Sequence, residues 1–495
     1  MSKSYITTAI PYVNAKPHIG FALELVQADV IARAHKEAGD DVRFLTGTDE
    51  NSIKNVQAAE KAGVPIQQFV DENANVFFKL TQSLNIGADY FIRTTEERHK
   101  KGAQKFWEAC KKDIFQKEYE GLYCTGCETF YLEKELENGL CPEHKTQPEP
   151  VHEKNYFFKL SDYSKFLLDA FENNKIRIHP KSRQNEVLNF IKEGLEDFSI
   201  SRSNERAKNW GIPVPGDDSQ MMYVWFDALT NYINALGYGS GDEALFEKYW
   251  NAPDAEVLHV IGKGIMRFHA IYWPAMLESA GIFPKNGIDI MVHGYVTVNG
   301  QKISKSIGNT VDPFELVEKY GADAVRYFLL REIPATEDGD FSEEKFIQRY
   351  NSDLANGLGN LVSRVATLAE KSGIANLGRS DETFTKPMED AERRINVGLV
   401  DYQLHMALSV LWELVMLGNQ YIDEQKPWSK SGDDTESILA NLSRLILRIR
   451  RLSRRFLPDI YKEIDKQFGI ADDTLTIDRN VKLRVHKGKP LFPRI

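Results

Sequence analysis

The sequence predicts an α/β fold built on a parallel sheet, with a central insertion and a following bundle of helices. Three observations lead to this prediction. Strand and helix patterns alternate along the first part of the chain, which is typical of a doubly wound sheet. The alternation breaks near residue 115, where a Cys/His cluster follows, and it resumes at Val257. From about Phe346 to about Phe468, Leu, Val and Ile recur at three- and four-residue spacing, as in packed helices.

Short local patterns define the elements of the α/β part. Strands are short β-rich runs, and the first helix ends at Gly39, a residue that favours a helix terminus. Thr46-Gly47-Thr48-Asp49 follows the second strand at its carboxyl end. The predicted elements are a strand at 5–10, a helix at 18–38, a strand at 42–45, helices at 50–62 and 65–84, strands at 89–93 and 257–261, a helix ending at Gly281 and a strand near 288–293.

Composition narrows the class of protein. The chain has 495 residues, 42% of them hydrophobic and 27% charged, as in ordinary globular proteins of several domains. It has no apolar run long enough to span a membrane, and its N-terminus lacks a signal-peptide pattern, so we expect a cytoplasmic protein. A net charge of −10 argues against non-specific coating of nucleic acid. Six arginines between Ser443 and Phe456 form either a local basic site or a solvated helix face.

Two short motifs point to ATP-dependent adenylation. Pro17-His18-Ile19-Gly20 lies at a strand-to-helix junction, where backbone N–H groups attract phosphates. Gly20 lets a flat adenine approach the backbone, and His18 can donate to a phosphate oxygen. The loop Lys302-Ile303-Ser304-Lys305-Ser306 follows Asn299-Gly300, and its two ammonium groups can clamp charge on the α-phosphate and the departing pyrophosphate. Mg²⁺ would share that charge. Each motif alone is ordinarily structural or solvated, so the pair makes the prediction.

Three of the four cysteines cluster with one histidine. The pairs Cys124-x-x-Cys127 and Cys141-x-x-His144 are separated by 13 residues. Each pair forms a tight turn, and two such turns close one tetrahedral site. Three thiolates and one imidazole leave no open position, so we expect one structural Zn²⁺; unligated thiols are the alternative. Cys110 is left over, and we expect it to be a buried apolar residue.

The order and separation of the two motifs resemble those of class I aminoacyl-tRNA synthetases, and nearly the whole chain resembles methionyl-tRNA synthetases. Ala-Ile-Pro-Tyr-Val-Asn at 9–14, Tyr-Val-Trp-Phe-Asp-Ala-Leu-Thr-Asn-Tyr at 223–232, and Ile-Gly-Lys, Arg-Phe-His and Tyr-Trp-Pro-Ala within 261–275 carry the closer resemblance. The resemblance implies a class I Rossmann-type catalytic domain, a zinc-knuckle connective insertion and an α-helical anticodon-binding bundle. It implies a methionine–tRNA ligase, which makes methionyl-adenylate and pyrophosphate from methionine and ATP and then esterifies the 3′ end of tRNA(Met) in translation.

The resemblance also implies a role for each matching position. Asp49 would hold the substrate ammonium, Tyr12 would place its hydroxyl near the sulfur, and Arg202 would support the transition state. The implied sets are Ile10, Tyr12, Asp49, Trp225, Ala228, Tyr232, Ile265 and His269 for methionine; His18, Gly20, Gly262, Lys302, Ser304 and Lys305 for ATP; His18, Arg202, Lys302 and Lys305 for catalysis; and Asn360, Arg364 and Trp428 for the anticodon.

Elementary chemistry agrees with these roles. A carboxylate at the end of a strand suits an ammonium, and aromatic and aliphatic groups suit a soft thioether. One methylene discriminates by only about 1–3 kcal/mol, so apolar burial alone cannot give selectivity. An unstacked base needs a flat aromatic partner and an edge reader. Without the resemblance, Trp225 and Tyr232 would be interpreted as core residues.

Three positions depart from the usual family pattern. Phe21 stands where a second His usually completes His-x-Gly-His, Gly264 where an Asp is usual, and Asn51 where His is frequent. A synthetase for another side chain, such as leucine or cysteine, is a second interpretation, weakened because the large editing insertion that leucine would need is lacking. A non-catalytic RNA-binding protein is a third, favoured by Phe21 and Gly264 and opposed by the intact lysine loop.

We expect five segments: 1–115 and 221–298 for the two halves of the catalytic domain, 116–220 for the insertion, 299–345 for the lysine loop and a stem-contact region, and 346–495 for the anticodon-binding domain with its C-terminal tail. The expected partners are ATP, L-methionine and both initiator and elongator tRNA(Met), with no membrane. Some relatives dimerise through an appended C-terminal domain that this sequence lacks, so we expect a monomer.

Overall fold

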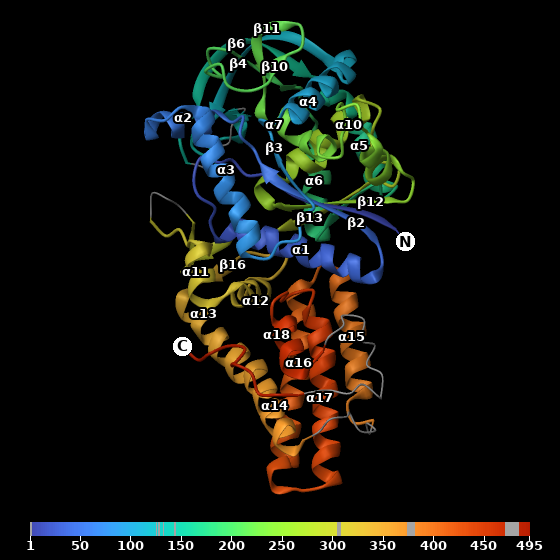
Figure 1. Ribbon diagram of the computed structural model, residues 1–495. Coiled ribbons are helices and arrows are strands. Elements are labelled where there is room, and N and C mark those ends of the chain that lie inside the picture. The colour runs from blue at the N-terminus through green and yellow to red at the C-terminus, as the bar shows by residue number, and fades with distance from the viewer. Residues whose placement is uncertain are drawn as a thin grey trace. The chain divides into compact units, whose positions relative to one another are not determined.

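The computed structural model describes residues 2–124, 126, 129–131, 133–142, 145–303, 308–373, 382–470 and 485–495 (Figure 1). These residues form two compact units. Unit 1 comprises 1–17, 35–82 and 87–293, and unit 2 comprises 18–34, 83–86 and 294–495.

A parallel six-stranded sheet forms the centre of unit 1, in the order β3-β2-β1-β12-β13-β7 (Figure 1). Its strands are β1 Lys3–Thr8, β2 Asp41–Thr48, β3 Tyr90–Arg93, β7 Ile176–His179, β12 Ala255–Gly262 and β13 Ile288–His293. From β1 the chain proceeds outward through β2 and β3 on one side, while β12 and β13 continue on the other. The order therefore reverses between β1 and β12, and ligands of such sheets bind outside the carboxyl ends of the strands at this switch point.

The strands predicted in the first half and near 257–261 and 288–293 are confirmed. The first helix, predicted at 18–38, is α1 Ile19–Ala38, and the next two are α2 Ile53–Ala62 and α3 Ile66–Ser83. The Ser52 hydroxyl caps α2 by accepting from Lys54 N, and Gly63 ends it with φ +69°. The residues between β2 and α2 are therefore a turn, although the sequence predicted that the helix would start at 50.

Two small sheets make up much of the region between residues 114 and 222. The four-stranded sheet has the order β5-β4-β6-β8, and the three-stranded sheet has the order β10-β11-β9. Their strands are β4 Ile114–Cys124, β5 Thr129–Tyr131, β6 Glu149–Phe158, β8 Phe198–Ser199, β9 Ser201–Ser203, β10 Pro213–Val214 and β11 Asp217–Met222. Within this region β7 pairs with β13 and so belongs to the central sheet, a strand that the sequence analysis did not predict.

Most of the remaining helical elements of unit 1 contribute side chains to one core that is rich in aromatic rings. Phe106 of α4 lies 5.6 Å from Trp273 and 5.7 Å from Phe226, measured between ring centroids. These elements are α4 Glu97–Ala109, η1 Lys111–Asp113, η2 Glu133–Glu135, η3 Leu160–Tyr163, α5 Ser164–Glu172, α6 Lys181–Glu193, α7 Val224–Leu229, α8 Asn231–Asn234, α9 Ala244–Phe246, η4 Glu247–Asn251, η5 Lys263–Ile265, η6 Phe268–Tyr272 and α10 Trp273–Ser279. Cys110 lies in this core, fully buried, as the sequence analysis expected.

Unit 2 joins a small sheet to a helical bundle. The sheet has the order β15-β14-β16, with strands β14 Val296–Val298, β15 Gln301–Lys302 and β16 Gly339–Phe341. The helices are α11 Pro313–Tyr320, α12 Ala322–Glu332, α13 Glu343–Arg349, η7 Tyr350–Gly359, α14 Asn360–Ser372, α15 Thr385–Val400, α16 Leu404–Gln425, η8 Pro427–Ser429, α17 Asp433–Ser453 and α18 Ile460–Phe468. α14 to α18 pack side by side, which confirms the predicted bundle (Figure 1). No helix in the described part of the chain is long and apolar enough to span a bilayer.

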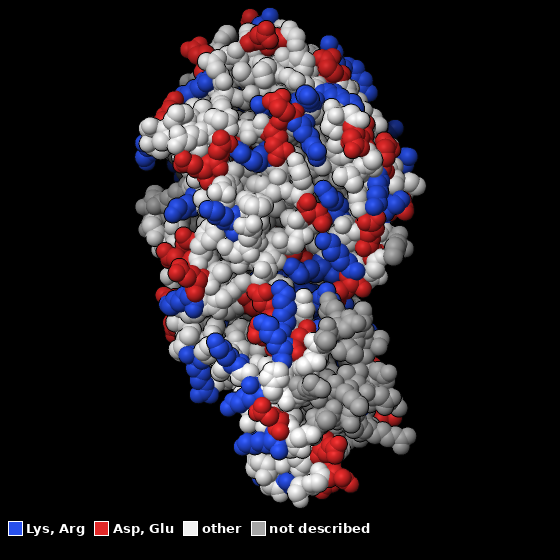
Figure 2. Space-filling view, in the orientation of Figure 1, with Lys and Arg blue, Asp and Glu red and all other residues white. Residues whose placement is uncertain are grey.

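The arginine-rich segment at 443–456 is held largely by contacts inside unit 2. Arg448 and Arg451 both pair with Glu392, and Arg450 makes two hydrogen bonds of 2.6 Å to Asp465. Arg450 is also only 5% exposed. Much of this charge is therefore neutralised within the bundle. On the face shown in Figure 2, acidic and basic side chains are interspersed.

Candidate active site

The turn after β2 places Asp49 at the carboxyl edge of the central sheet. Asp49 N donates to Pro11 O at 2.9 Å, and Tyr12 and Asp49 form a parallel bridge. Asn55 Nδ2 donates to Asp49 O at 3.1 Å, so the turn is anchored from α2 as well. The sequence segments 9–14 and 46–49, which were predicted to act together, therefore lie side by side next to the switch point of the sheet.

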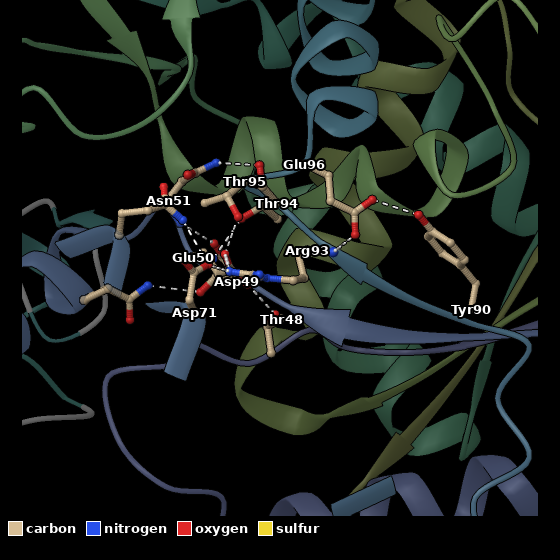
Figure 3. A network of polar contacts seen from close by, with 12 residues as sticks. Thr48, Asp49, Glu50, Asn51, Asp71, Tyr90, Arg93, Thr94, Thr95 and Glu96 are labelled. Carbon is tan, nitrogen blue, oxygen red and sulfur yellow. Dashed lines mark hydrogen bonds and ion pairs between the residues drawn. The ribbon is translucent and has the colours of Figure 1, made fainter. Parts of the chain in front are cut away.

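The neighbouring carboxylate, Glu50, is fully buried and paired with Arg93 (Figure 3). Arg93 Nε and Nη2 donate to the two Glu50 oxygens at 2.7 and 2.9 Å, and Thr48 Oγ1 donates to Glu50 at 2.8 Å. Asp71 also accepts from Arg93. Glu50 is therefore neutralised within the turn by a bidentate ion pair.

An aromatic wall stands on the helices that follow the insertion. The Trp225 and Phe268 rings stack with centroids 3.8 Å apart and an interplanar angle of 3°. His269 lies edge-on to Trp225 at 6.4 Å. Ala228 is buried, while Ile10 and Ile265 are partly buried and pack against the same core. The structure thus brings five residues of the predicted pocket into one packed region of unit 1: Ile10, Trp225, Tyr232, Ile265 and His269.

Hydrogen bonds fix the protonation of His269. Its Nδ1 lies 2.9 Å from Ile265 O, an acceptor, so Nδ1 carries the proton. Its Nε2, 2.7 Å from the Tyr232 hydroxyl, therefore accepts from Tyr232. Burial lowers the pKa of His269 to about 4, so the ring is neutral near neutral pH. Tyr232 and His269 hence present a fixed, uncharged polar edge within an apolar wall.

Sequence reasoning missed two aromatic residues near this wall. One is Phe268, the stacking partner of Trp225. Phe268 directly precedes His269 in the sequence, and this position next to a predicted pocket residue could have indicated it. The other is His259 on β12, whose ring lies 4.2 Å from the Tyr232 ring and whose Nδ1 lies 2.7 Å from Thr7 Oγ1. Burial lowers the pKa of His259 well below its ordinary value. A lone histidine inside a predicted strand carries no sequence signal for such a position.

Arg202 lies on β9 in a largely buried position. Its Nη1 donates to Ser201 O at 2.7 Å and to Ser199 Oγ at 3.0 Å. Its guanidinium also lies over the Tyr223 ring at 4.3 Å. Tyr223 directly precedes α7, so Arg202 is held against the start of the helix that carries Trp225.

In unit 2, His18 and Gly20 form a compact turn at the start of α1. Gly20 N donates to His18 Nδ1 at 3.1 Å. Since Nδ1 accepts, a neutral His18 ring carries its proton on Nε2. A Cβ on residue 20 would lie 2.9 Å from His18 Cε1, so glycine at this position is required for the observed ring placement. Phe21 follows on α1, half-buried.

The lysine loop begins on a tight hairpin. Asn299 and Gly300 have φ of +51° and +73°, the geometry that an Asn-Gly pair favours between β14 and β15. Lys302 Nζ lies 5.4 Å from the Tyr295 ring centroid, and Asn309 Nδ2 donates to Lys302 O at 3.1 Å across the base of the loop. Ser304 and Lys305 lie outside the described residues. In unit 1, Gly262 ends β12, and a Cβ there would lie 3.5 Å from the His293 ring.

The three predicted anticodon residues come together in unit 2. Arg364 on α14 pairs with Asp423 at 2.6 Å, and its guanidinium lies 5.4 Å from the Trp428 ring centroid. Trp428 is 53% exposed, which is unusual for so large an apolar ring. Asn360, one turn before Arg364, donates to Asn419 Oδ1 at 3.4 Å. An exposed indole beside a guanidinium suits stacking of a nucleobase.

Two of the four predicted metal ligands can be placed. Cys124 ends β4, and Lys145 N donates to the carbonyl oxygen of Cys141 at 2.8 Å. Both thiols are buried, and Thr146 contacts both residues: its Oγ1 lies 4.0 Å from Cys124 Sγ, and its carbonyl accepts from Cys141 N. Cys127 and His144 lie outside the described residues. Among all the residues that the structure describes, no group of three or more His, Cys, Asp or Glu could hold a metal.

The parallel sheet and its switch point, with the histidine–glycine turn and the lysine hairpin, define a class I aminoacyl-tRNA synthetase. The family model "tRNA synthetases class I (M)" matches residues 4–148 and 132–366. The chain belongs to the methionine–tRNA ligase family.

Individual relatives agree with this assignment. The methionine–tRNA ligase of Thermotoga maritima is 43% identical, covering 100% of this chain and 80% of that protein. The Brucella melitensis methionine–tRNA ligase is 42% identical, covering 99% and 98%. The solved structure of Mycobacterium tuberculosis methionyl-tRNA synthetase in complex with methionyl-adenylate is 37% identical and covers 100% of both chains with a TM-score of 0.93.

Proposed function

We propose that this chain makes methionyl-adenylate from L-methionine and ATP and then transfers the methionyl group to tRNA(Met). The observation that carries the proposal is a hydrogen bond in unit 1 between two parts of the candidate site. It joins the buried turn that bears Asp49 to the helix of the aromatic wall that bears Trp225. Asn51, two residues after Asp49, donates at 3.1 Å to Asp227, which lies on the helix of Trp225. A carboxylate linked in this way to a neutral, largely apolar wall matches an amino acid with a soft side chain.

In this proposal, Asp49 binds the ammonium of methionine, and the wall binds its thioether. The side-chain pocket consists of Ile10, Tyr12, Trp225, Ala228, Tyr232, Ile265 and His269. Tyr12 places its hydroxyl near the sulfur. The neutral state of His269 supports the assignment, because a charged imidazole would favour water over a thioether.

For adenylation, a carboxylate oxygen of methionine attacks the α-phosphorus of ATP in line. One O–P bond forms, the bond from the α-phosphorus to the bridging oxygen breaks, and pyrophosphate leaves with the electron pair. His18 donates from Nε2 to a phosphate oxygen, Lys302 and Lys305 neutralise developing charge, and Arg202 supports the transition state. Gly20, Gly262 and Ser304 complete the ATP site. Mg²⁺, bound with ATP, supplies further charge neutralisation on the phosphates.

The bundle would recognise the anticodon. Trp428 stacks on an unpaired base, and Asn360 and Arg364 read base edges beside it. A hydroxyl of the terminal ribose of tRNA then attacks the carbonyl carbon of the adenylate, AMP leaves with the electron pair of the broken acyl–phosphate bond, and the hydroxyl proton is released. Both initiator and elongator tRNA(Met) are substrates in this proposal, the enzyme acts as a cytoplasmic monomer, and the five segments with the boundaries given above divide these tasks.

We further propose that Cys124, Cys127, Cys141 and His144 bind one structural Zn²⁺. The two described cysteines support it because both are buried and both contact Thr146, Cys124 through its thiol and Cys141 through its backbone N. Purified protein should contain one Zn²⁺ per chain by elemental analysis, and Cys141→Ser should lose it. Protein that is folded and metal-free as isolated would exclude the site.

The decisive test of function is amino-acid-dependent ATP–pyrophosphate exchange with methionine, leucine, isoleucine and cysteine. We expect exchange with methionine alone, followed by charging of tRNA(Met). Exchange with leucine or cysteine would identify another specificity. No exchange from folded protein that still binds tRNA would favour a non-catalytic RNA-binding role, the interpretation that Phe21 and Gly264 suggest.

A further inference from the structure

Asn51 uses its side chain to connect two separate elements of unit 1. Its Nδ2 donates to Thr94 O at 3.2 Å, just beyond β3, and to Asp227 Oδ2 at 3.1 Å on α7. These bonds use both hydrogens of the amide. The backbone N of Asn51 also lies 3.3 Å from Asp49 Oδ1. One residue therefore contacts the ammonium-binding carboxylate and tethers its turn to the wall of the pocket (Figure 3 shows the turn and Thr94).

Asp227 is a fully buried carboxylate approached from two sides. Asn51 is on one side, and His99 of α4 is on the other, with Nε2 at 3.6 Å from Asp227 Oδ1. His99 Nδ1 faces the donor Asn234 Nδ2 at 3.3 Å, so Nδ1 accepts and Nε2 carries the proton. Burial raises the pKa of Asp227, while His99 and Asn51 oppose that rise. The Asn51 amide thus donates a hydrogen bond to a carboxylate that would otherwise be costly to bury, and the His99 ring lies close to its other oxygen.

Asp227 lies in the middle of the short helix α7, so its hydrogen bond to Asn51 helps to hold this helix in place. α7 is only six residues long, Val224–Leu229, so few backbone hydrogen bonds hold it in place. Trp225 and Ala228 lie three residues apart and share one face of this helix. The tether at Asp227 therefore acts on the element that carries two residues of the pocket.

We propose that Asn51 and Asp227 are a positioning pair for amino-acid recognition, whose hydrogen bond sets the turn bearing Asp49 relative to the helix bearing Trp225. The inference rests on the proposed function, because it takes Asp49 as the ammonium site and Trp225 as the pocket wall. In methionine a fixed number of bonds joins the ammonium to the sulfur. Both groups therefore bind well only when the protein holds Asp49 and the pocket wall at a matching separation. Neither member of the pair needs to touch the substrate.

The test exchanges the two side chains. In Asn51→Asp, two carboxylates face each other, and the hydrogen bond is lost. In the double variant Asn51→Asp/Asp227→Asn, the new amide at 227 can donate to the new carboxylate at 51, although the bond to Thr94 O is not restored. The readout is the dissociation constant of three probes: L-methionine, L-methioninol, which keeps the ammonium, and 4-(methylthio)butanoate, which lacks it.

We expect Asn51→Asp to weaken L-methionine and L-methioninol about ten- to hundredfold, as for a lost hydrogen bond to a charged group. The butanoate should weaken less than about threefold, and the double variant should recover most of the loss. A purely structural role would weaken all three probes alike. Equal losses, no loss, or no recovery in the double variant would each overturn the inference.

A matched control is available in the insertion. Asn155 is also fully buried, and its Nδ2 donates to Glu153 Oε2 at 3.1 Å, so Asn155→Asp likewise places two carboxylates face to face. It should lower the melting temperature without changing the ratio of the three dissociation constants; a changed ratio would overturn the inference. The wild-type protein tests the function itself. If it does not bind L-methionine, the proposed function fails and the inference fails with it, whereas methionine binding insensitive to Asn51→Asp removes the inference alone.

Discussion

Replacing Gly20 by alanine would show why a glycine follows His18. The added Cβ would lie 2.9 Å from His18 Cε1 and 3.0 Å from its Nδ1, closer than the ring can tolerate. Because His18 is exposed, the ring can swing away and lose the 3.1 Å bond from Gly20 N. Alanine favours a helix over glycine by about 1 kcal/mol, so the melting temperature should not fall. Misplacing one donor to the transition state costs ~2.7 kcal/mol, or about a hundredfold in rate.

The assay is kcat/KM for ATP in methionine-dependent pyrophosphate exchange, measured in two backgrounds. In the wild-type background Gly20→Ala should cost about a hundredfold. In a His18→Ala background the same substitution should cost little, because the ring that it displaces is gone. An equal loss in both backgrounds would refute this reasoning and would indicate that the glycine serves close approach of adenine instead.

Three further substitutions test other parts of the molecule. Trp428→Ala should lower kcat/KM for tRNA in aminoacylation about ten- to hundredfold and leave pyrophosphate exchange unchanged, since base stacking contributes about 1–3 kcal/mol. Trp428→Phe keeps a flat ring and should retain most of the aminoacylation activity. A fall in pyrophosphate exchange would contradict the anticodon role. Tyr232→Phe removes the hydroxyl that donates to buried His269 Nε2 and should lower the free energy of unfolding by about 1–3 kcal/mol in urea titrations. An unchanged free energy of unfolding would contradict a stabilising role for this hydrogen bond. Burial raises the pKa of Asp323 from 3.8 to about 7. Between pH 3.8 and about 7 the folded state therefore holds a proton on Asp323 that the unfolded state loses. The free energy of unfolding should fall as the pH rises through this range. Asp323→Asn still accepts from Asp459 N and Ile460 N and should abolish that fall in urea titrations at pH 5 and pH 8; the same fall in both proteins would exclude Asp323 as its cause.

The elements with strong local patterns were predictable. The helix at 18–38 became α1 Ile19–Ala38, and the strand before Asp49 became β2, because apolar runs and a terminal glycine define both in the sequence itself. The strand β7 was not predicted, since the four residues Ile176–His179 become a strand only by pairing with β13, more than 100 residues later. The segment η7 was expected as helix, and its π-helical hydrogen bonding depends on tertiary packing that a periodic pattern does not encode.

The candidate site likewise contains residues that the sequence identifies and contacts that it does not. Asp49, Trp225 and Trp428 could be selected from the sequence because each stands in a segment that resembles a known family. The Asn51–Asp227 hydrogen bond joins residues 176 positions apart, and only the folded sheet brings them together. The arginines at 443–456 were expected either on a basic site or on a solvated face, but Glu392 and Asp465 pair with three of them from other helices. Charge in a sequence does not reveal which charges are already paired in the fold.

The turn after β2 also limits how this region can change in evolution. Asp49, Glu50 and Asn51 are consecutive, yet the last two contact different elements: Glu50 pairs with Arg93, and Asn51 with Asp227. One inserted or deleted residue between Thr48 and Ser52 would move each side chain into its neighbour's direction. Asp49 could then face Arg93, and Glu50 could face Asp227. Sequences that exchange one of these residues can keep the arrangement, whereas sequences that alter the length of the turn cannot, so length is the property that selection would hold constant here.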